Sequence, residues 1–413
     1  MSWVSVWRNQ KLVGTELPPA VITGAYQTGI LGVRTLTRHG VRAVCVDCDS
    51  TMPGFRSRYG PARLCPDPDR EPDQWVAYMC ALAEEMGQRP ALIHSADRFV
   101  SAAGKHERAL REHYFMPEAM EIQRLLADKP TQYGLADKHG LRLPRSIAAT
   151  SIEEVQQFSS ESSFPCLLKP VHFREWQRFP TSHPLCHRKI LIANTPADLV
   201  HGWRLAAQIN STVILQEIIR GSDDAKRVYL AVYDHNCQKL GGLVLKELRC
   251  EPVGFGPASV TTPIKDDEVE NICDRFLRDI GYVGICEIEL KRDARDGLVK
   301  LIEANPRLSG SGDAANYAGV ELCWLHYQDL IGRIVAPVGP SSEHFCHIVL
   351  RADASAAVEY WRRGLVTAIE ATQPYFGRCY FFDLDWGDWR YSLETLVVAA
   401  KTIVAGLIRP LSQ

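Results

Sequence analysis

In the first part of the chain, segments with two different patterns of apolar residues follow one another. Residues 20–24, 41–47 and 91–94 are short apolar runs, which are typical of buried strands. Between them, residues 29–39 and 75–86 repeat their apolar positions at helical spacing. This alternation predicts a parallel sheet with helices on both faces.

Beyond residue 120 the pattern continues with further strands and helices. A helix is predicted over 125–139, because Gly140 follows its last apolar position. Strands are predicted at 164–170, 189–193, 213–219, 229–233 and 240–248, and helices at 195–208 and 266–280. Two strand-like runs, 286–290 and 301–307, flank a polar turn at 292–297, which predicts a β-hairpin, and further strands are predicted around 347–350 and 379–382.

The C-terminal part differs in composition. Pro and Ser residues after Ala336 form a linker-like cluster. The last helix carries a stripe of apolar residues at helical spacing: Leu393, Leu396, Val397, Ala400, Ile403, Val404 and Leu407. Because Glu394 and Lys401 provide only a weak polar face, this stripe is predicted to pack on the protein rather than on a membrane.

Bulk composition narrows the class of protein. The chain has 413 residues, 46% of them hydrophobic and 23% charged, which fits a soluble protein of two or three domains. A net charge of −2 predicts no nucleic-acid surface, and no apolar run reaches the roughly 20 residues of a membrane span. The N-terminus lacks the pattern of a signal peptide, and the 13 cysteines have scattered spacings, which together predict a cytoplasmic protein with reduced thiols.

Two features of the first domain suggest alternative functions. Cys45 and Cys48 form a CxxC, but no second Cys or His pair lies nearby to complete a zinc site. The turn from Gly24 to Gly29 and the later Asp47 resemble a dinucleotide site, although Tyr26 stands where such a site needs Gly. An NAD-dependent oxidoreductase therefore stays open as a weaker alternative.

The predicted hairpin concentrates oxygen ligands. Pairing of its strands is expected to bring Glu289 close to Glu303 and Asn305. Carboxylate and amide oxygens are what Mg²⁺ binds, usually with ATP phosphates completing the shell. A solvated hairpin without a ligand is the alternative interpretation.

Several cations precede this hairpin. Lys169 ends an apolar strand, and a half-buried lysine needs an anion, for which phosphate is a good candidate. Lys189 opens the next strand and can meet the same anion, whereas Lys129 on its own is typical of a solvated helix. Arg249 and Arg307 have planar guanidinium groups that suit carboxylates and phosphates. One of them can hold the acyl substrate and the other a transferring phosphoryl group.

A strand end supplies the candidate base site. Gln216, Glu217, Ile218 and Ile219 can pair with an adenine edge and enclose the ring, and Asp224 can take a ribose hydroxyl or orient Lys169. The segment His94–Arg98 also ends a strand of the first domain and is expected at a substrate cleft.

Taken in order, these residues resemble an ATP-grasp enzyme over roughly residues 20–335. The pattern is most similar to carboxylate–amine ligases of the D-aspartate ligase kind. The resemblance implies a mixed α/β and α+β fold: an arm (1–18), a Rossmann-like preATP-grasp domain (19–120), an ATP-grasp domain (121–338) and a small α+β extension (339–413).

The resemblance also implies roles. Lys129 and Lys169 would contact nucleotide phosphates, residues 216–219 would hold adenine, Glu289, Glu303 and Asn305 would bind Mg²⁺ (or Mn²⁺), and Arg307 would stabilise the transferring phosphoryl group. The reaction would convert a small-molecule carboxylate to an acylphosphate that an amine attacks, giving an amide, ADP and phosphate. A homodimer is compatible with this interpretation.

One segment departs from the family pattern. Many relatives have a Gly-rich loop after the Lys169 strand, whereas residues 171–188 contain no glycine. Side chains such as Arg174 or Arg178 would then cover the phosphates, or the loop would contact the second substrate. The same departure keeps open a non-catalytic nucleotide-binding or scaffold protein.

Overall fold

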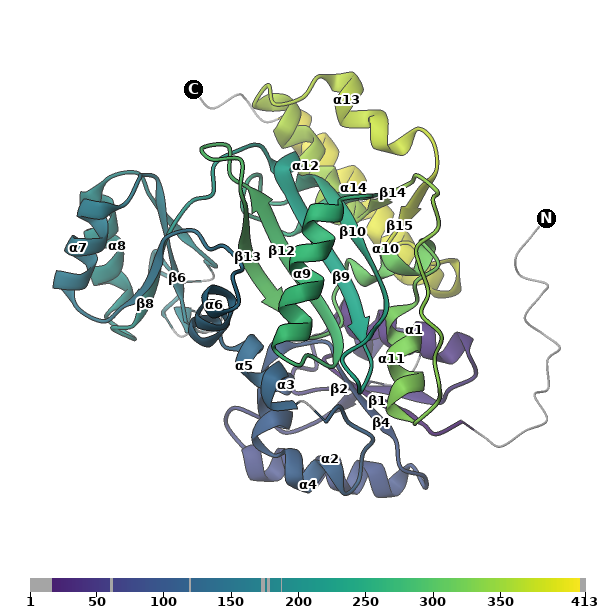
Figure 1. Ribbon diagram of the computed structural model, residues 1–413. Helices are drawn as coiled ribbons and strands as arrows, with labels where there is room; N and C mark the ends of the chain where they lie inside the picture. Colours follow the sequence, from purple (N-terminus) through teal and green to yellow (C-terminus); the bar gives the residue numbers. More distant parts are fainter. Residues whose placement is uncertain are drawn as a thin grey trace.

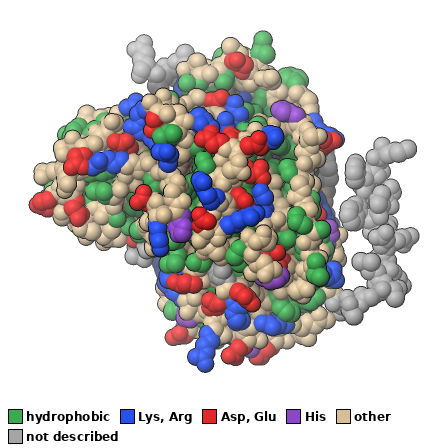
Figure 2. Space-filling view, in the orientation of Figure 1, with side chains coloured by type: hydrophobic (Ala, Val, Ile, Leu, Met, Phe, Trp, Pro, Cys, Tyr) green, Lys and Arg blue, Asp and Glu red, His purple; other side chains and the backbone are tan. Residues whose placement is uncertain are grey.

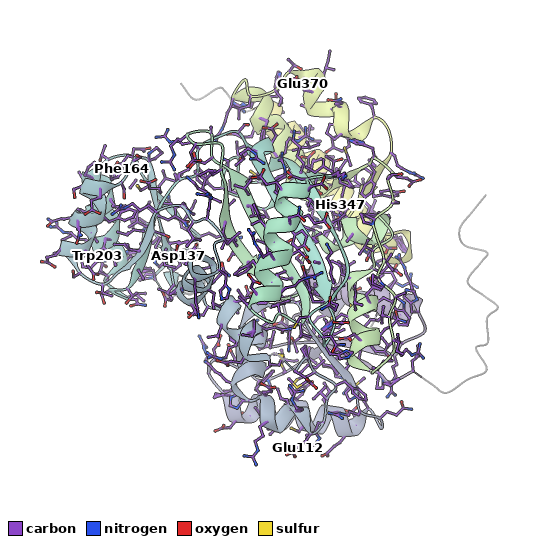
Figure 3. The ribbon with its side chains drawn as sticks, in the orientation of Figure 1. Glu112, Asp137, Phe164, Trp203, His347 and Glu370 are labelled. Atoms are coloured by element: carbon purple, nitrogen blue, oxygen red, sulfur yellow. The ribbon has the colours of Figure 1, made fainter. Side chains whose placement is uncertain are left out.

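The computed structural model describes residues 17–59, 62–118, 120–171, 175–176, 179–186 and 188–408. The described residues form three β-sheets, each with its own helices (Figure 1). In Figure 3, Glu112 marks the first body, Trp203 the second and Glu370 the helices near the C-terminal end. The predicted mixed α/β class is confirmed, while residues 1–16 of the predicted arm lie outside the described residues.

The first body contains the predicted parallel sheet. Its strands are β1 (Ala20–Thr23), β2 (Ala43–Asp47), β3 (Arg63–Leu64) and β4 (Ala91–His94), in the order β3-β2-β1-β4. Its helices are α1 (Gln27–Arg38), η2 (Pro53–Arg56), α2 (Pro72–Glu85), α3 (Asp97–Lys105) and α4 (Glu107–Arg111). Ile22 packs with Leu31 of α1, and its neighbour Val21 packs with Trp75 of α2, so helices cover both faces.

The second body, residues 146–217, is a small lobe that projects from the molecule (Figure 1). It consists of β5 (Ser146–Ala149), α7 (Ile152–Glu161), β6 (Cys166–Pro170), β7 (Leu191–Ala193), α8 (Pro196–Ala206) and β8 (Val213–Glu217). The strands pair antiparallel in the order β5-β8-β6-β7. Phe158 of α7 and Leu199 of α8 pack with Leu168 and Leu215, so one face of this sheet is covered and Lys169 ends a buried strand.

The helix predicted over 125–139 is instead two helices. These are α5 (Met120–Ala127) and α6 (Lys129–Lys138). The break occurs because Asp128 caps α6, its carboxylate accepting from the Thr131 backbone N–H at 3.2 Å, and because Pro130 fits the first turn of a helix. Lys129 therefore begins a helix instead of lying on the surface of a longer one.

The central sheet is the largest. Its strands are β9 (Lys226–Tyr233), β10 (Lys239–Cys250), β11 (Ala258–Ile264), β12 (Gly284–Arg292), β13 (Val299–Asn305), β14 (Cys346–Ile348) and β15 (Cys379–Phe381), in the order β13-β12-β9-β10-β11-β14-β15. All pairs are antiparallel except β14–β15. The short helix η4 (Asp223–Ala225) precedes β9.

The two faces of the central sheet have different neighbours. Helix α9 (Asp267–Asp279) covers one face, where Phe276 packs with Tyr229 and Ile288 (Figure 1). On the opposite face, Leu230 and Leu245 join the core that contains α1, α10 (Gly312–Tyr317) and α11 (Leu322–Leu330). The first body is thereby fixed against the central sheet.

A β-bulge in β13 decides which side chains reach this second face. Leu290 pairs with Leu301, but the next pair is Glu289 with Glu303, so Ile302 is an extra residue. Leu301 lies in the core under α9, and without the bulge Glu303 would share that face, because side chains alternate along a strand. The bulge thus directs Glu303 and Asn305 away from α9.

The C-terminal part extends the central sheet and adds helices. These are α12 (Leu350–Arg362), α13 (Ala368–Thr372), η5 (Gln373–Tyr375), η6 (Trp386–Asp388) and α14 (Trp389–Ile408). The expectation that the apolar stripe of the last helix packs on the protein is wrong for its described side chains: α14 buries Ser392, Thr395 and Ala399, while Leu393 and Val397 face outward. The side chain of Leu407 lies outside the described part.

No helix among the described residues is long and apolar enough to cross a membrane. On the face shown in Figure 2, acidic and basic side chains are interspersed rather than separated by sign.

Candidate active site

Four oxygen-bearing side chains share the face of the central sheet opposite α9. Glu289 pairs with Glu303, and Glu287 pairs with Asn305 across the hairpin. The Asn305 amide donates to Glu287 Oε1 at 3.2 Å. The structure therefore brings the three predicted metal ligands to one place and adds Glu287, which the sequence analysis missed although it lies two positions before Glu289 in the same strand.

The carboxylates of this group repel one another. Burial and the neighbouring charges of Glu287 and Glu303 raise the pKa of Glu289 to about 8. Crowded carboxylates of this kind are what a divalent cation stabilises, and the all-oxygen donor set suits Mg²⁺. The residues present therefore fit the predicted metal, as four donors on one face.

A second acidic cluster already contains a cation. In the described part of the chain, Asp223, Glu247 and Cys250 are the only three His, Cys, Asp or Glu residues whose possible metal-binding atoms all lie within 4.8 Å of one another. The Lys226 ammonium lies 2.8 Å from Glu247 Oε1 and 3.4 Å from Asp223 Oδ1. Because Lys226 supplies the positive charge, this cluster is a buried ion-pair network rather than a metal site.

Two lysines flank Glu303. Lys129 Nζ lies 3.3 Å from Glu303 Oε1, and this carboxylate raises the pKa of Lys129. Burial opposes ionisation of Glu303, but the charges of Lys129, Lys169 and Arg307 outweigh it and lower the pKa of Glu303. Three cationic side chains thus surround the Glu303 carboxylate, between the small lobe and the central sheet.

Lys169 lies deeper than Lys129. Its ammonium donates to Gln216 Oε1 at 3.2 Å and to the hydroxyl of Tyr133, a residue that the sequence analysis did not single out. Burial, together with the charge of Lys129, lowers the pKa of Lys169 to about 7. A buried ammonium that is only partly ionised at neutral pH is well placed to gain its proton when an anion arrives.

Given the role in phosphate binding that the resemblance implies for Lys169, this shift predicts an affinity for ATP that depends on pH. The Lys169 pKa lies below its ordinary value, so the free protein loses the Lys169 charge as pH rises through 7. Bound phosphates favour the charged form. We expect ATP affinity to fall by up to about tenfold per pH unit above pH 7, with proton uptake on binding. Calorimetry in buffers of different ionisation enthalpy measures both effects.

The matched control is Lys169→Arg, because a guanidinium stays charged throughout this range. Its ATP affinity should vary much less with pH than that of the wild type. Wild-type affinity that is constant above pH 7 would contradict the assignment of Lys169 as a phosphate ligand.

Arg307 connects the sheet face that carries Glu287 and Asn305 to the first body. Its Nε and Nη2 donate to the two carboxylate oxygens of Asp97, at 2.6 and 3.2 Å, and Nη2 also donates to Asn305 Oδ1 at 3.1 Å. Asp97 begins α3 and belongs to the segment expected at a substrate cleft. A continuous chain of hydrogen bonds thus runs from Glu287 through Asn305 and Arg307 to Asp97.

Arg249 does not join this group, which corrects its prediction as a catalytic residue. Its guanidinium forms a bidentate, fully buried pair with Asp353 of α12, at 2.8 and 2.6 Å, and donates to the Ala371 carbonyl at 2.8 Å. All of its planar donating edge is directed at the C-terminal helices. Arg249 therefore holds these helices to the central sheet instead of binding a substrate.

The predicted adenine segment lies at the end of β8. Gln216 is buried beside Lys169, and Ile219 is buried just beyond the strand. Glu217 is engaged elsewhere: it accepts from the Ser163 backbone N–H at 2.8 Å and pairs with Arg295 at 2.9 Å. The segment thus ties the small lobe to the turn of the β12–β13 hairpin.

Asp224 is not brought to Lys169, and Lys189 precedes the strand that it was predicted to open. Asp224 is exposed and pairs with Lys246 at 3.0 Å, whereas its neighbour Asp223 points inward and accepts from Tyr360. Lys189 is exposed in the loop before β7, because that strand begins at Leu191 and not at the predicted residue 189. Asp223, rather than Asp224, is the inward-facing acid at this strand end.

The glycine-free loop is anchored by its aromatic residues. Trp176, Phe179 and Leu185 are buried in the core of the small lobe, and Phe179 stacks on His183 with ring centroids 3.7 Å apart. Arg174 and Arg178, predicted to cover the phosphates, lie outside the described residues.

The candidate dinucleotide site is occupied by the protein itself. The Asp47 carboxylate accepts from the Ala25 backbone N–H and from Arg98 Nη2, both at 2.8 Å. The acid that would take a ribose hydroxyl is therefore already paired, which disfavours the NAD alternative.

Comparisons with known proteins bear on the whole arrangement. No family model matches the chain. In sequence it is similar to the D-aspartate ligase of Enterococcus faecium (strain Aus0004), with 25% identity over 298 residues that cover 68% of this chain and 69% of that protein. It is also similar to the carbamoyl phosphate synthase large chain of Methanothrix thermoacetophila, with 24% identity over 192 residues, 44% of this chain and 16% of that protein.

Solved structures with the same fold have nucleotides bound. The N5-carboxyaminoimidazole synthetase of Staphylococcus aureus in complex with ADP matches with a TM-score of 0.61 at 14% identity, covering 82% of this chain and 85% of that chain. The biotin carboxylase domain of Hydrogenobacter thermophilus 2-oxoglutarate carboxylase, with MgADP, matches with a TM-score of 0.59 at 14% identity, covering 78% and 71%.

The chain therefore shares the fold of these nucleotide-bound enzymes and is similar in sequence to a D-aspartate ligase. The resemblance predicted from the sequence, including the likeness to D-aspartate ligase, is thus confirmed. In this chain the small lobe contributes Lys169 and Gln216 to the site, and the central sheet contributes Glu303 and Arg307. Lys129 and Tyr133 of α6 lie between the two sheets.

Proposed function

We propose that this chain is an ATP-dependent carboxylate–amine ligase that forms an amide through an acylphosphate, with Mg-ATP as the cosubstrate. One observation carries the proposal: Lys129, Lys169 and Arg307 surround Glu303 on a face that also presents Glu287, Glu289 and Asn305. Phosphoryl transfer needs this combination of positioned cations and metal ligands more than it needs a covalent catalyst.

The reaction balances as two displacements. A carboxylate oxygen of the first substrate attacks the γ-phosphorus of ATP, and the bond to the ADP oxygen breaks, giving an acylphosphate and ADP. The amine of the second substrate then attacks the acyl carbon, loses a proton and expels phosphate. When bound by Glu289, Glu303, Asn305 and the adjacent Glu287, Mg²⁺ would neutralise phosphate charge.

The protein's own side chains have distinct tasks in this scheme. Lys169 and Lys129 bind phosphate oxygens, and the charge of Lys129 reaches Glu303 directly. Arg307 has a planar fork already oriented by Asp97 and Asn305, so it can stabilise the equatorial oxygens of the transferring group without reorganising. Gln216 and Ile219 line the place for the base.

Relatives narrow the substrate class. The sequence relative with the longest match is named D-aspartate ligase, which supports small carboxylate and amine substrates of the amino-acid type. Two structures of the same fold hold ADP or MgADP, which supports ATP and Mg²⁺ as the cosubstrate and metal.

The test uses hydroxylamine as a general amine. Purified protein, Mg-ATP and pools of D- and L-amino acids or other small carboxylates should release ADP and form a hydroxamate with at least one carboxylate. With that carboxylate labelled by ¹⁸O, the label should appear in phosphate, because the acylphosphate oxygen leaves with phosphorus. ATP binding without ADP release on any pool would instead favour a non-catalytic nucleotide-binding protein and overturn the proposal.

A further inference from the structure

Helix α14 packs on α12 with its small and polar residues. Ser392, Thr395 and Ala399 are buried, and Arg351 Nε donates to Thr395 Oγ1 at 3.1 Å. Close approach of the two helices depends on Gly406, since a Cβ there would come within 2.9 Å of Val358. The buried side of α14 is therefore a fixed contact, made without a large apolar side chain among the described residues.

The opposite side of α14 is apolar and exposed. Leu393, Val397, Val404 and Ile408 follow one line along the helix and have 55%, 45%, 54% and 75% of their surface exposed. Leu396, Val398 and Ile403 flank this line and are also exposed. A contiguous stripe of large apolar side chains on a soluble chain marks a surface that a partner covers.

We propose that this stripe is the interface between two copies of the chain, whose α14 helices pack antiparallel about a two-fold axis. The charges on the exposed side support one arrangement. Glu394 and Lys401 are seven positions apart, so they lie on the same flank of the stripe. Antiparallel packing places each Glu394 against the partner's Lys401, twice, with Val397 and Val398 near the axis.

Other arrangements do not satisfy these charges. In a parallel pair, Glu394 of each copy would lie at the same level as the partner's Glu394, and neither would meet a lysine. Glu394 already pairs with Arg351 within the chain at 3.0 Å, yet 59% of its side chain is exposed, which leaves a carboxylate oxygen for a second cation.

A membrane surface fits less well than a second copy. Helices that lie on membranes have a polar face rich in Lys and Arg. On α14 the described residues of the exposed side provide one acid and one lysine, and the side opposite the stripe is covered by α12. The balanced, symmetrically placed pair of charges favours a protein partner with the same sequence.

Charge exchange tests the antiparallel dimer. Sedimentation velocity of the full chain over a dilution series should show a dimer for the wild type. Glu394→Lys or Lys401→Glu alone should weaken it by about tenfold or more in Kd, because two ion pairs become like-charge contacts. The double exchange should restore the homodimer, and a mixture of the two single variants should form a heterodimer.

Matched variants separate this interface from a general effect of added charge. Val397→Glu, at the axis, should give a monomer. Ile334→Glu, which replaces a fully exposed apolar residue outside α14, should leave the dimer unchanged. Thermal melting of each variant identifies any that fail to fold, and the mixing experiment does not depend on either single variant dimerising by itself.

Three results would overturn the proposal. One is a wild type that stays monomeric at every concentration. Another is a dimer that survives Val397→Glu together with both charge variants, which would place the interface elsewhere. The third is a monomer that binds anionic lipid vesicles more tightly as Glu394→Lys and less tightly as Lys401→Glu, which would assign the stripe to a membrane.

Discussion

Replacing Glu303 by Gln is expected to reduce ATP-dependent product formation by about a thousandfold or more. The substitution keeps the shape of the side chain but removes the charge that pairs with Lys129 and that would face a cation beside Glu289. Lys129 would then be left to repel Lys169 without compensation, so the loss should include weaker binding of Mg-ATP.

ADP release measured against Mg²⁺ concentration checks this expectation, with thermal melting as a measure of folding. The matched control is Glu268→Gln, which removes an exposed acid that pairs with Arg292 at 2.6 Å and lies on α9, across the sheet. The control should keep its turnover. A Glu303→Gln protein that binds Mg-ATP and turns over like the wild type would refute the metal-ligand assignment.

Arg307→Lys is expected to reduce kcat about a hundredfold or more while changing ATP affinity little. A lysine keeps the positive charge but lacks the planar fork that Asp97 and Asn305 orient. The substitution should therefore slow phosphoryl transfer, the step in which negative charge spreads over the transferring group. The free energy of unfolding should change little.

Arg249→Lys is expected to lower stability and to leave kcat nearly unchanged. This substitution breaks a buried bidentate pair with Asp353, which should lower the free energy of unfolding by about 3 kcal/mol or more. The folded fraction should keep near wild-type kcat. Denaturant unfolding and steady-state kinetics on both variants check the contrast. A kcat loss in Arg249→Lys equal to that in Arg307→Lys would contradict a purely structural role for Arg249.

The grouping of the hairpin's oxygen-bearing side chains could be predicted from the sequence because it is local. Strand, turn and strand follow one another without interruption, so Glu289, Glu303 and Asn305 can be placed together from pairing alone. The burial of Lys169 was likewise predictable, because this residue lies near the end of an apolar strand.

The distinction between the two arginines could not be predicted, because their partners are distant in sequence. Arg249 meets Asp353, 104 residues later, and Arg307 meets Asp97, 210 residues earlier. From the sequence alone, both guanidinium groups look unpaired. Asp97 was expected at a substrate cleft but not as the partner of Arg307, and Tyr133 was missed because it belongs to no recognisable motif.

The orientation of α14 was predicted wrongly because an apolar stripe was assumed to face inward. Spacing shows only that such a stripe shares one side of a helix, not which neighbour covers it. Here Gly406 and the small residues around Ala399 permit a closer approach to α12 than the larger side chains would.

The extra residue in β13 makes the site unequally sensitive to changes in chain length. Insertions or deletions in the turn that follows Arg292 alter a surface loop, a kind of change that proteins commonly tolerate. Loss of the extra residue Ile302 would leave Glu303 opposite Glu289, whereas one residue added between Glu303 and Asn305 would turn Asn305 toward α9, because side chains alternate along a strand. Divergent copies of this chain can therefore vary the loop, but they must keep Glu303 and Asn305 two positions apart.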